Sequence, residues 1–177
     1  MSNLRLVNDT SVTSGVSTTS ITNVFSSDFE IYKVVAENIV TSAEAFFSLR
    51  FINSSGSIIS SNDYDFADLF LKSNTTFTER NVYTNYDDIF DFNLSIGSVS
   101  GGAGNTLAYI YNPTNTNTYT YLTFQASSVF NDSGTKGFIQ KGLGILKQKT
   151  SITGLHFISN TGTHTANIKV YGLRVDS

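Results

Sequence analysis

The chain has 177 residues and a formal net charge of −3, and it contains no cysteine. The length suits one domain, and the charge disfavours nucleic-acid binding, which needs an electropositive surface. The lack of thiols excludes disulfides, thiolate metal sites and thiol nucleophiles. Only 14% of the residues are charged while 13% are aromatic, which is typical of a β-rich domain. The longest apolar run, residues 107–111, is far shorter than the roughly 20 residues that a membrane span needs.

Short runs of alternating apolar and polar residues follow one another along the chain, separated by loops rich in Ser, Asn and Gly. Alternation with a period of two predicts strands with one buried face. The alternation is clearest in residues 45–53, 89–96 and 119–126. In chain order, the predicted strands are residues 4–8, 20–25, 29–40, 45–53, 64–71, 89–96, 107–112, 119–126, 137–146, 151–159 and 166–174.

This spacing predicts an all-β fold, an antiparallel β-sandwich of jelly-roll type, formed by residues 1–177 as a single domain. A helix competes in residues 63–72, but Tyr64, Phe66 and Phe70 share one parity and favour a strand. The side chains that we expect in the buried core are those of Phe47, Leu49, Phe51, Phe90, Phe92, Leu94, Leu122, Phe124, Ile168 and Val170.

The beginning of the chain leaves two alternatives open. Residues 11–20 are rich in Ser and Thr, so they form either a flexible arm, which could extend over residues 1–20, or an exposed edge strand. A polar arm gains little by folding onto its own domain, so the arm would reach a neighbouring subunit. The start has no apolar segment of the kind that marks a signal peptide, and we therefore expect folding in a cytoplasm.

Two clusters of acids are the candidates for a metal site. They comprise Asp63, Asp65 and Asp68, and Asp87, Asp88 and Asp91. Carboxylates at this spacing can bind Ca²⁺, although neither cluster has the glycine and the terminal acid of an EF-hand loop. Solvated acids at loops and strand ends are the simpler interpretation, and the sequence does not decide between the two.

The catalytic candidates are weak. The chain has only two histidines, His156 in a predicted strand and His164 in a Thr-rich loop, and it has no G-x-S-x-G motif. The glycine-rich residues 101–104 precede a predicted strand rather than a helix, so they do not form a phosphate-binding loop. Gly142 and Gly144 lie within a predicted strand and indicate a bulge or close packing. We therefore expect no enzymatic activity and no cofactor.

Four tyrosines fall on two strands of one predicted hairpin, and three lysines follow further along the chain. They suit sugar stacking or a protein interface; the alternative for the tyrosines is an aromatic face buried in the sandwich or between identical subunits. Lysines at the rim of an interface would add salt-sensitive steering. The candidate interface residues are Tyr109, Tyr111, Tyr119, Tyr121, Lys141, Lys147 and Lys149.

Several segments together are similar to those of known proteins. They include VFSSDFEIYK at residues 24–33, LRFINSSG at 49–56, NDYDFA at 62–67, SITGLHF at 151–157 and IKVYGL at 168–173. These segments resemble the jelly-roll structural proteins of marine cyanophages and related tailed phages. The motifs are short and consist of common strand residues, but the resemblance extends over most of the chain.

The resemblance implies a bacteriophage virion component, assembled in the host cytoplasm, with no enzymatic residues to carry over. The sequence has no heptad shaft and no anchoring segment, so we expect a capsid decoration protein rather than a fibre tip. The alternative is a tail-fibre or receptor-binding component that recognises a host surface glycan. In either case the expected partners are other virion proteins, and the expected assembly is a homotrimer, because threefold closure suits capsids and fibres alike.

Overall fold

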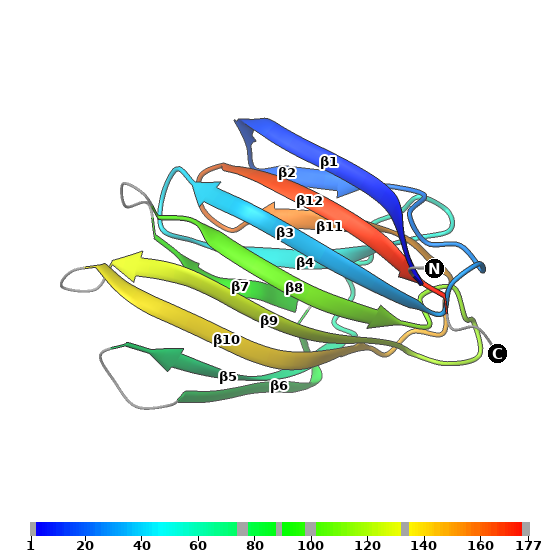
Figure 1. Cartoon of the computed structure of the whole chain (residues 1–177). Coiled ribbons are helices and arrows are strands. Elements are labelled where there is room, and N and C mark those ends of the chain that lie inside the picture. Colours follow the sequence, from blue (N-terminus) through cyan, green and yellow to red (C-terminus); the bar gives the residue numbers. More distant parts are fainter. Residues whose placement is uncertain (1–2, 74–77, 88–89, 98–101, 132–134, 175–177) are drawn as a thin grey trace.

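The strands pair antiparallel throughout the described part of the chain and form two facing sheets (Figure 1). The computed structural model describes residues 3–73, 78–87, 90–97, 102–131 and 135–174. No helix occurs within these ranges, so none that could cross a membrane is found there. The predicted β-sandwich of jelly-roll type is confirmed.

One sheet has eight strands and the other has four. Across the wider sheet the order is β1 (Leu4–Val16), β12 (His164–Leu173), β3 (Ile31–Thr41), β8 (Gly104–Tyr111), β9 (Thr120–Asn131), β10 (Thr135–Leu146), β5 (Tyr64–Lys72) and β6 (Thr78–Asp87). Across the narrower sheet the order is β2 (Thr18–Ile21), β11 (Ile152–Ser159), β4 (Ala45–Asn53) and β7 (Phe90–Ile96).

Four pairs of consecutive strands cross between the sheets in matching order. In the wider sheet β1, β12, β3 and β8 lie side by side, and their chain neighbours β2, β11, β4 and β7 have the same order in the narrower sheet. The remaining strands of the wider sheet, β9, β10, β5 and β6, continue beyond this double layer (Figure 1). Of these strands, β9, β10 and β5 contact β7, which is the edge of the narrower sheet.

The core lies between the sheets and is built from the inward-facing residues of both. The Phe90 ring packs edge-on against Phe51 and Tyr64, with centroid distances of 5.8 and 4.7 Å. The buried Tyr64 hydroxyl donates to the Ile59 carbonyl at 3.0 Å, so its polar atom is satisfied. Leu94 lies outside the described side chains. The other expected core residues are at most 5% exposed: Phe47, Leu49, Phe51, Phe90, Phe92, Leu122, Phe124, Ile168 and Val170.

The beginning of the chain forms edge strands. Residues 4–16 pair with β12 and residues 18–21 pair with β11. Of the two alternatives left open for this segment, the described residues therefore form edge strands rather than a free arm. The side chains along β1 are mostly exposed because no strand covers the other side of this edge.

One strand, β6, was not predicted. Its sequence, TERNVYTNYD, has a single aliphatic residue and no regular alternation. The strand forms because it pairs with β5, where Asp68 lies opposite Arg80 and Leu69 lies opposite Glu79. The ion pair between Asp68 and Arg80 stabilises this strand pair, and an ion pair leaves no apolar alternation for sequence patterns to detect.

The two glycines within β10 reflect close packing rather than a bulge, because the register is continuous on both sides of this strand. A Cβ atom on Gly142 would lie 2.8 Å from the Ala67 carbonyl oxygen. A Cβ atom on Gly144 would overlap the buried ring of Phe90. Both positions therefore bring the backbone of β10 close to its neighbours.

We predict that Gly144→Ala lowers the free energy of unfolding by about 1–3 kcal/mol, because the core has no room for the added methyl group. The matched control is Gly137→Ala on the same strand, where the nearest atoms are 3.9 Å away on Ser73. This control substitution should lower the free energy of unfolding by less than about 0.5 kcal/mol. Denaturant unfolding measures both variants, and equal losses would contradict the close packing against Phe90.

Candidate functional site

The outer face of the eight-stranded sheet is more apolar than a solvated sheet face normally is. Antiparallel sheets with one wet side usually alternate apolar residues inward with polar residues outward. Here Ile139 and Leu143 of β10 point outward and are 46% and 50% exposed. Leu69 and Leu71 of β5 are each 38% exposed. Exposed apolar side chains on adjoining strands mark a surface for interaction.

The tyrosines of the β8–β9 hairpin contribute to this face. Tyr111 lies opposite Tyr121 across the hairpin, and Tyr109 lies opposite Thr123. Tyr121 is 41% exposed and Tyr119, just before β9, is 37% exposed, while Tyr109 and Tyr111 are half-buried. The alternative of an aromatic face buried inside the sandwich is therefore wrong, and the hairpin presents its rings outward.

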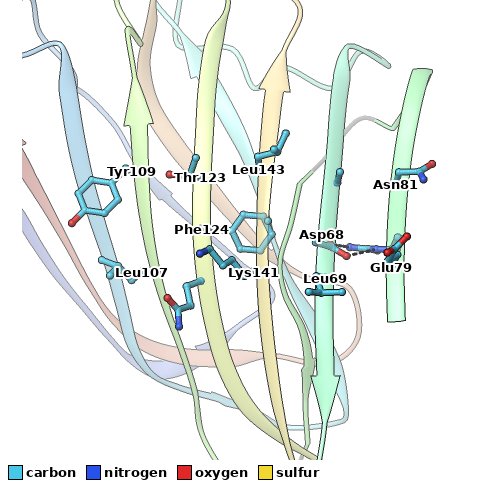
Figure 2. A pocket seen from close by; sticks show the side chains of 14 residues that line it. Asp68, Leu69, Glu79, Asn81, Leu107, Tyr109, Thr123, Phe124, Lys141 and Leu143 are labelled. Carbon is cyan, nitrogen blue, oxygen red and sulfur yellow. Dashed lines mark hydrogen bonds and ion pairs between the residues drawn. The ribbon is translucent and has the colours of Figure 1, made fainter. Parts of the chain in front are cut away.

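A groove of about 670 Å³ crosses β8, β9, β10, β5 and β6 on this face (Figure 2). Figure 2 shows Leu107 and Tyr109 on one side and Glu79 and Asn81 on the other. The residues that line the groove are Ala67, Asp68, Leu69, Glu79, Arg80, Asn81, Leu107, Tyr109, Thr123, Phe124, Gln125, Lys141, Gly142 and Leu143.

The cross-strand register explains this arrangement. Leu107 lies opposite Gln125, Gln125 opposite Lys141, and Lys141 opposite Leu69, which in turn lies opposite Glu79. One row across five strands therefore combines two leucines with an amide, an ammonium and a carboxylate. Within the described part of the chain, no hydrogen bond or ion pair engages the side chains of Gln125, Lys141 and Glu79.

The three candidate lysines are separated by the fold. Lys141 is exposed and lines the groove. Lys147 forms an ion pair with Asp65 at 2.9 Å, and Lys149 is exposed in the loop after β10. Neither of the last two lines the groove. The sequence therefore identified one groove lysine of the three.

The first acidic cluster does not converge on a point where a cation could bind. Asp63 accepts a hydrogen bond from Gln148 at 2.7 Å, and hydrogen bonds from Ser61 and Gln148 lower its pKa below the ordinary value. Asp65 pairs with Lys147, while Asp68 points to the other side of β5. In the described part of the chain, no group of three potential metal ligands lies together. The side chains of Asp87 and Asp88 lie outside the described residues.

Asp68 and Asp91, which come from different clusters, are joined by Arg80. The Arg80 guanidinium lies 2.6 Å from Asp68 and 2.5 Å from Asp91. Asp68 also accepts from Gln140 at 2.8 Å, and Asp91 accepts from Ser48 at 3.0 Å. Because Asp68 and Arg80 belong to the wider sheet and Asp91 to the narrower one, the three charges tie the two sheets together.

The environment of Arg80 keeps it charged. Burial alone would lower its pKa, but hydrogen bonds to Asp68 and Asp91 outweigh the burial and raise the pKa above the ordinary value. The guanidinium carbon also lies 4.6 Å from the centre of the Phe66 ring, within range of a cation–π contact. No sequence pattern indicates this pairing, since Arg80 is a single cation in the unpredicted strand β6.

Neither histidine lies at the groove. His156 is on β11, as expected, and His164 is the first residue of β12 and is fully buried. The expectation that His164 lies in a loop is wrong. The side chains hydrogen-bonded to the two rings are Thr19, Ser20 and Ser159. Within the described residues no carboxylate is bonded to either ring, so no Ser–His–acid arrangement forms there.

The sequence matches no known protein family and no curated protein. Among solved structures, the infectious bursal disease virus VP2 subviral particle is similar at 12% sequence identity, with a TM-score of 0.17. The match covers 96% of this chain and 40% of that chain, so this chain spans well under half of the VP2 length. A TM-score this low supports no conclusion about function.

We predict that Arg80→Met destabilises the protein by about 3–5 kcal/mol, because the fully buried Asp68 carboxylate loses its countercharge. Methionine keeps the apolar stem of the side chain, so the loss reports the charge. The control is Lys169→Met, whose pair with Glu37 is exposed and 3.7 Å long, and it should cost less than about 1 kcal/mol. Similar losses in the two variants would contradict the bridging role of Arg80.

Proposed function

We propose that this protein is a structural component of a bacteriophage particle, and specifically a decoration protein attached through the outer face of its wider sheet. The virion assignment is supported by the resemblance of residues 24–33, 49–67 and 151–173 to tailed-phage structural proteins, together with the jelly-roll sandwich that such proteins use. The attachment is supported by one observation: exposed leucines, an isoleucine and tyrosines occupy a sheet face that would be polar if it remained in water.

The proposed occupant of this face is a neighbouring virion protein that inserts apolar side chains into the groove. The groove is concave, so a second copy of the same face would leave a hollow between the two, whereas a projecting segment fills it. Leu69, Leu107 and Leu143 supply apolar contact area, and Gln125 and Lys141 can bond to the backbone or to an acid of that segment. Burial of these leucines against the inserted segment supplies most of the affinity of the protein for its neighbour on the particle.

A host glycan is the second candidate occupant, as part of a tail component that recognises the receptor. The observation in its favour is the set of polar groups on the groove, including Gln125, Lys141 and Asn81. Against it, aliphatic side chains do not stack on sugar rings, and Tyr109 is the single aromatic lining residue that is not almost fully buried. The groove therefore favours a protein. The homotrimer and the absence of catalysis stay predictions.

The test replaces two groove leucines and counts copies on purified particles by quantitative mass spectrometry. We predict that Leu69→Ser with Leu143→Ser reduces occupancy by about tenfold or more, because about 1.4 kcal/mol of lost apolar burial already corresponds to tenfold in affinity. The matched control is Phe46→Ser with Ile58→Ser. These residues are each 40% exposed and lie outside the groove, so occupancy should be unchanged.

The outcome also separates the two candidate occupants. Reduced occupancy with normal host adsorption per particle supports decoration. Full occupancy of the groove variant combined with a loss of host adsorption supports the glycan alternative and overturns the proposal. Equal loss of occupancy in both variants would show that the outer face has no special role.

A further inference from the structure

Both histidines of the chain are hydrogen-bonded to the same short strand, β2. The Nδ1 atom of His156 lies 2.7 Å from the Ser20 hydroxyl, and the Nε2 atom of His164 lies 2.9 Å from the Thr19 hydroxyl. Thr19 and Ser20 are consecutive residues in the middle of β2. Because side chains alternate along a strand, Thr19 points into the sandwich and Ser20 points out of it. The two rings therefore hold β2 from opposite faces of the narrower sheet.

His164 bridges the two sheets in an uncharged environment. It lies on the inner face of β12, is 0% exposed, and its second nitrogen, Nδ1, lies 2.9 Å from the Ser159 hydroxyl of β11. The Phe47 ring of β4 packs edge-on against it at 5.0 Å. The residues paired with it on β1 and β3 are Val16 and Thr41. No acid from any of these elements faces the ring to balance a positive charge.

His156 has a neighbour that opposes protonation. It lies on β11 between Ser20 of β2 and Arg50 of β4, which are its cross-strand partners. The ring is 8% exposed. Burial, and secondly the positive charge of Arg50, disfavour the charged imidazolium. The two groups facing this ring across the sheet are therefore one neutral hydroxyl and one cation.

Apart from its pairing with β11 and the flanking bonds from the Ser159 N–H to the Ser17 carbonyl and from the Val24 N–H to the Thr153 carbonyl, this strand has few other attachments. β2 has four residues and pairs only with β11, since it is the edge of the narrower sheet. Thr18 and Ser20 are exposed, and Ile21 is the one fully buried side chain of the strand. A short edge strand with one buried side chain belongs to the part of a protein that opens most easily.

We propose that His156 and His164 form an acid-sensitive latch that keeps β2 on the sandwich only while both rings are neutral. Release of β2 gives each ring access to water, where it can take up a proton without burying an uncompensated charge. The freed edge of β11 then becomes available for pairing with another strand. The latch does not depend on what the groove binds.

The direction of the pH effect follows from the two environments. Burial lowers the pKa of His164 below the ordinary value of 6.5, and burial together with Arg50 lowers that of His156. The open state therefore binds more protons than the closed state once the pH falls below about 6.5. The closed state is fully favoured above that pH and loses stability as the pH falls through the lowered pKa values.

Amide hydrogen exchange of the full chain, expressed as protection factors at pH 7.5 and pH 5.0, tests the latch. We expect the protection of residues 18–21 to fall by about tenfold or more at pH 5.0, since one pKa unit corresponds to tenfold in the open population. Protection of residues 168–170 in β12 should change much less. His156→Gln with His164→Gln removes both titrating rings and should abolish the selective change.

A second measurement covers the case in which the double variant folds poorly. His156→Gln alone leaves one titrating ring and should reduce the loss of protection at pH 5.0. Nuclear magnetic resonance titration of the wild-type imidazole protons should show both rings protonating over the pH range in which β2 loses protection.

Equal protection of residues 18–21 at the two pH values would overturn the latch. A loss that is uniform over β2 and β12, or unchanged in His156→Gln and in the double variant, would also overturn it.

Discussion

The ion bridge from Arg80 to Asp68 and Asp91 fixes the part of the fold that the narrower sheet does not cover. Eight strands face four, so β9, β10, β5 and β6 lie beyond the double layer, where β7 is the strand of the narrower sheet that β9, β10 and β5 contact. Arg80 connects β6 to β5 through Asp68, and to β7 through Asp91. With the Asp68 side chain fully buried, neither charge can be removed without leaving the other unbalanced. The position of β6, and with it one wall of the groove, depends on this bridge.

The groove forms where β5 and β6 continue the outer face of the wider sheet. The same cross-strand row that places Leu107, Gln125 and Lys141 on the inner strands ends with Leu69 and Glu79 on the overhanging pair. Inside the sandwich, Asp68 is bonded to both Gln140 and Arg80, whereas Gln125 and Lys141 of the groove face outward. The wider sheet therefore has two chemically different faces, one that packs in the core and one that exposes apolar side chains. The second face is the one that we propose for attachment to the particle.

Sequence patterns predicted the sandwich because most strands carry alternating residues, and the predicted bounds of residues 45–53 match β4. Parity placed Tyr121 on the face opposite to Leu122 and Phe124, but it left open whether the tyrosine face is exposed, which the structure answers. The patterns failed where the structure depends on single long-range pairs. Strand β6 is held by Arg80 rather than by apolar alternation, and His164 is buried by contacts with Thr19 and Ser159 that no local rule predicts. The edge strand β1 has too few apolar residues to distinguish it from a free arm.

Side-chain footprinting tests the central claim most directly, namely that the outer face of the wider sheet is the attachment surface. Hydroxyl-radical labelling of Leu69, Tyr121 and Leu143 is compared between the isolated protein and the intact particle, with Phe46 as the reference on the other sheet. The account predicts strong protection of the three outer-face residues in the particle and unchanged labelling of Phe46. Unchanged labelling of Leu69 and Leu143 in the particle, with protection at Phe46, would contradict it.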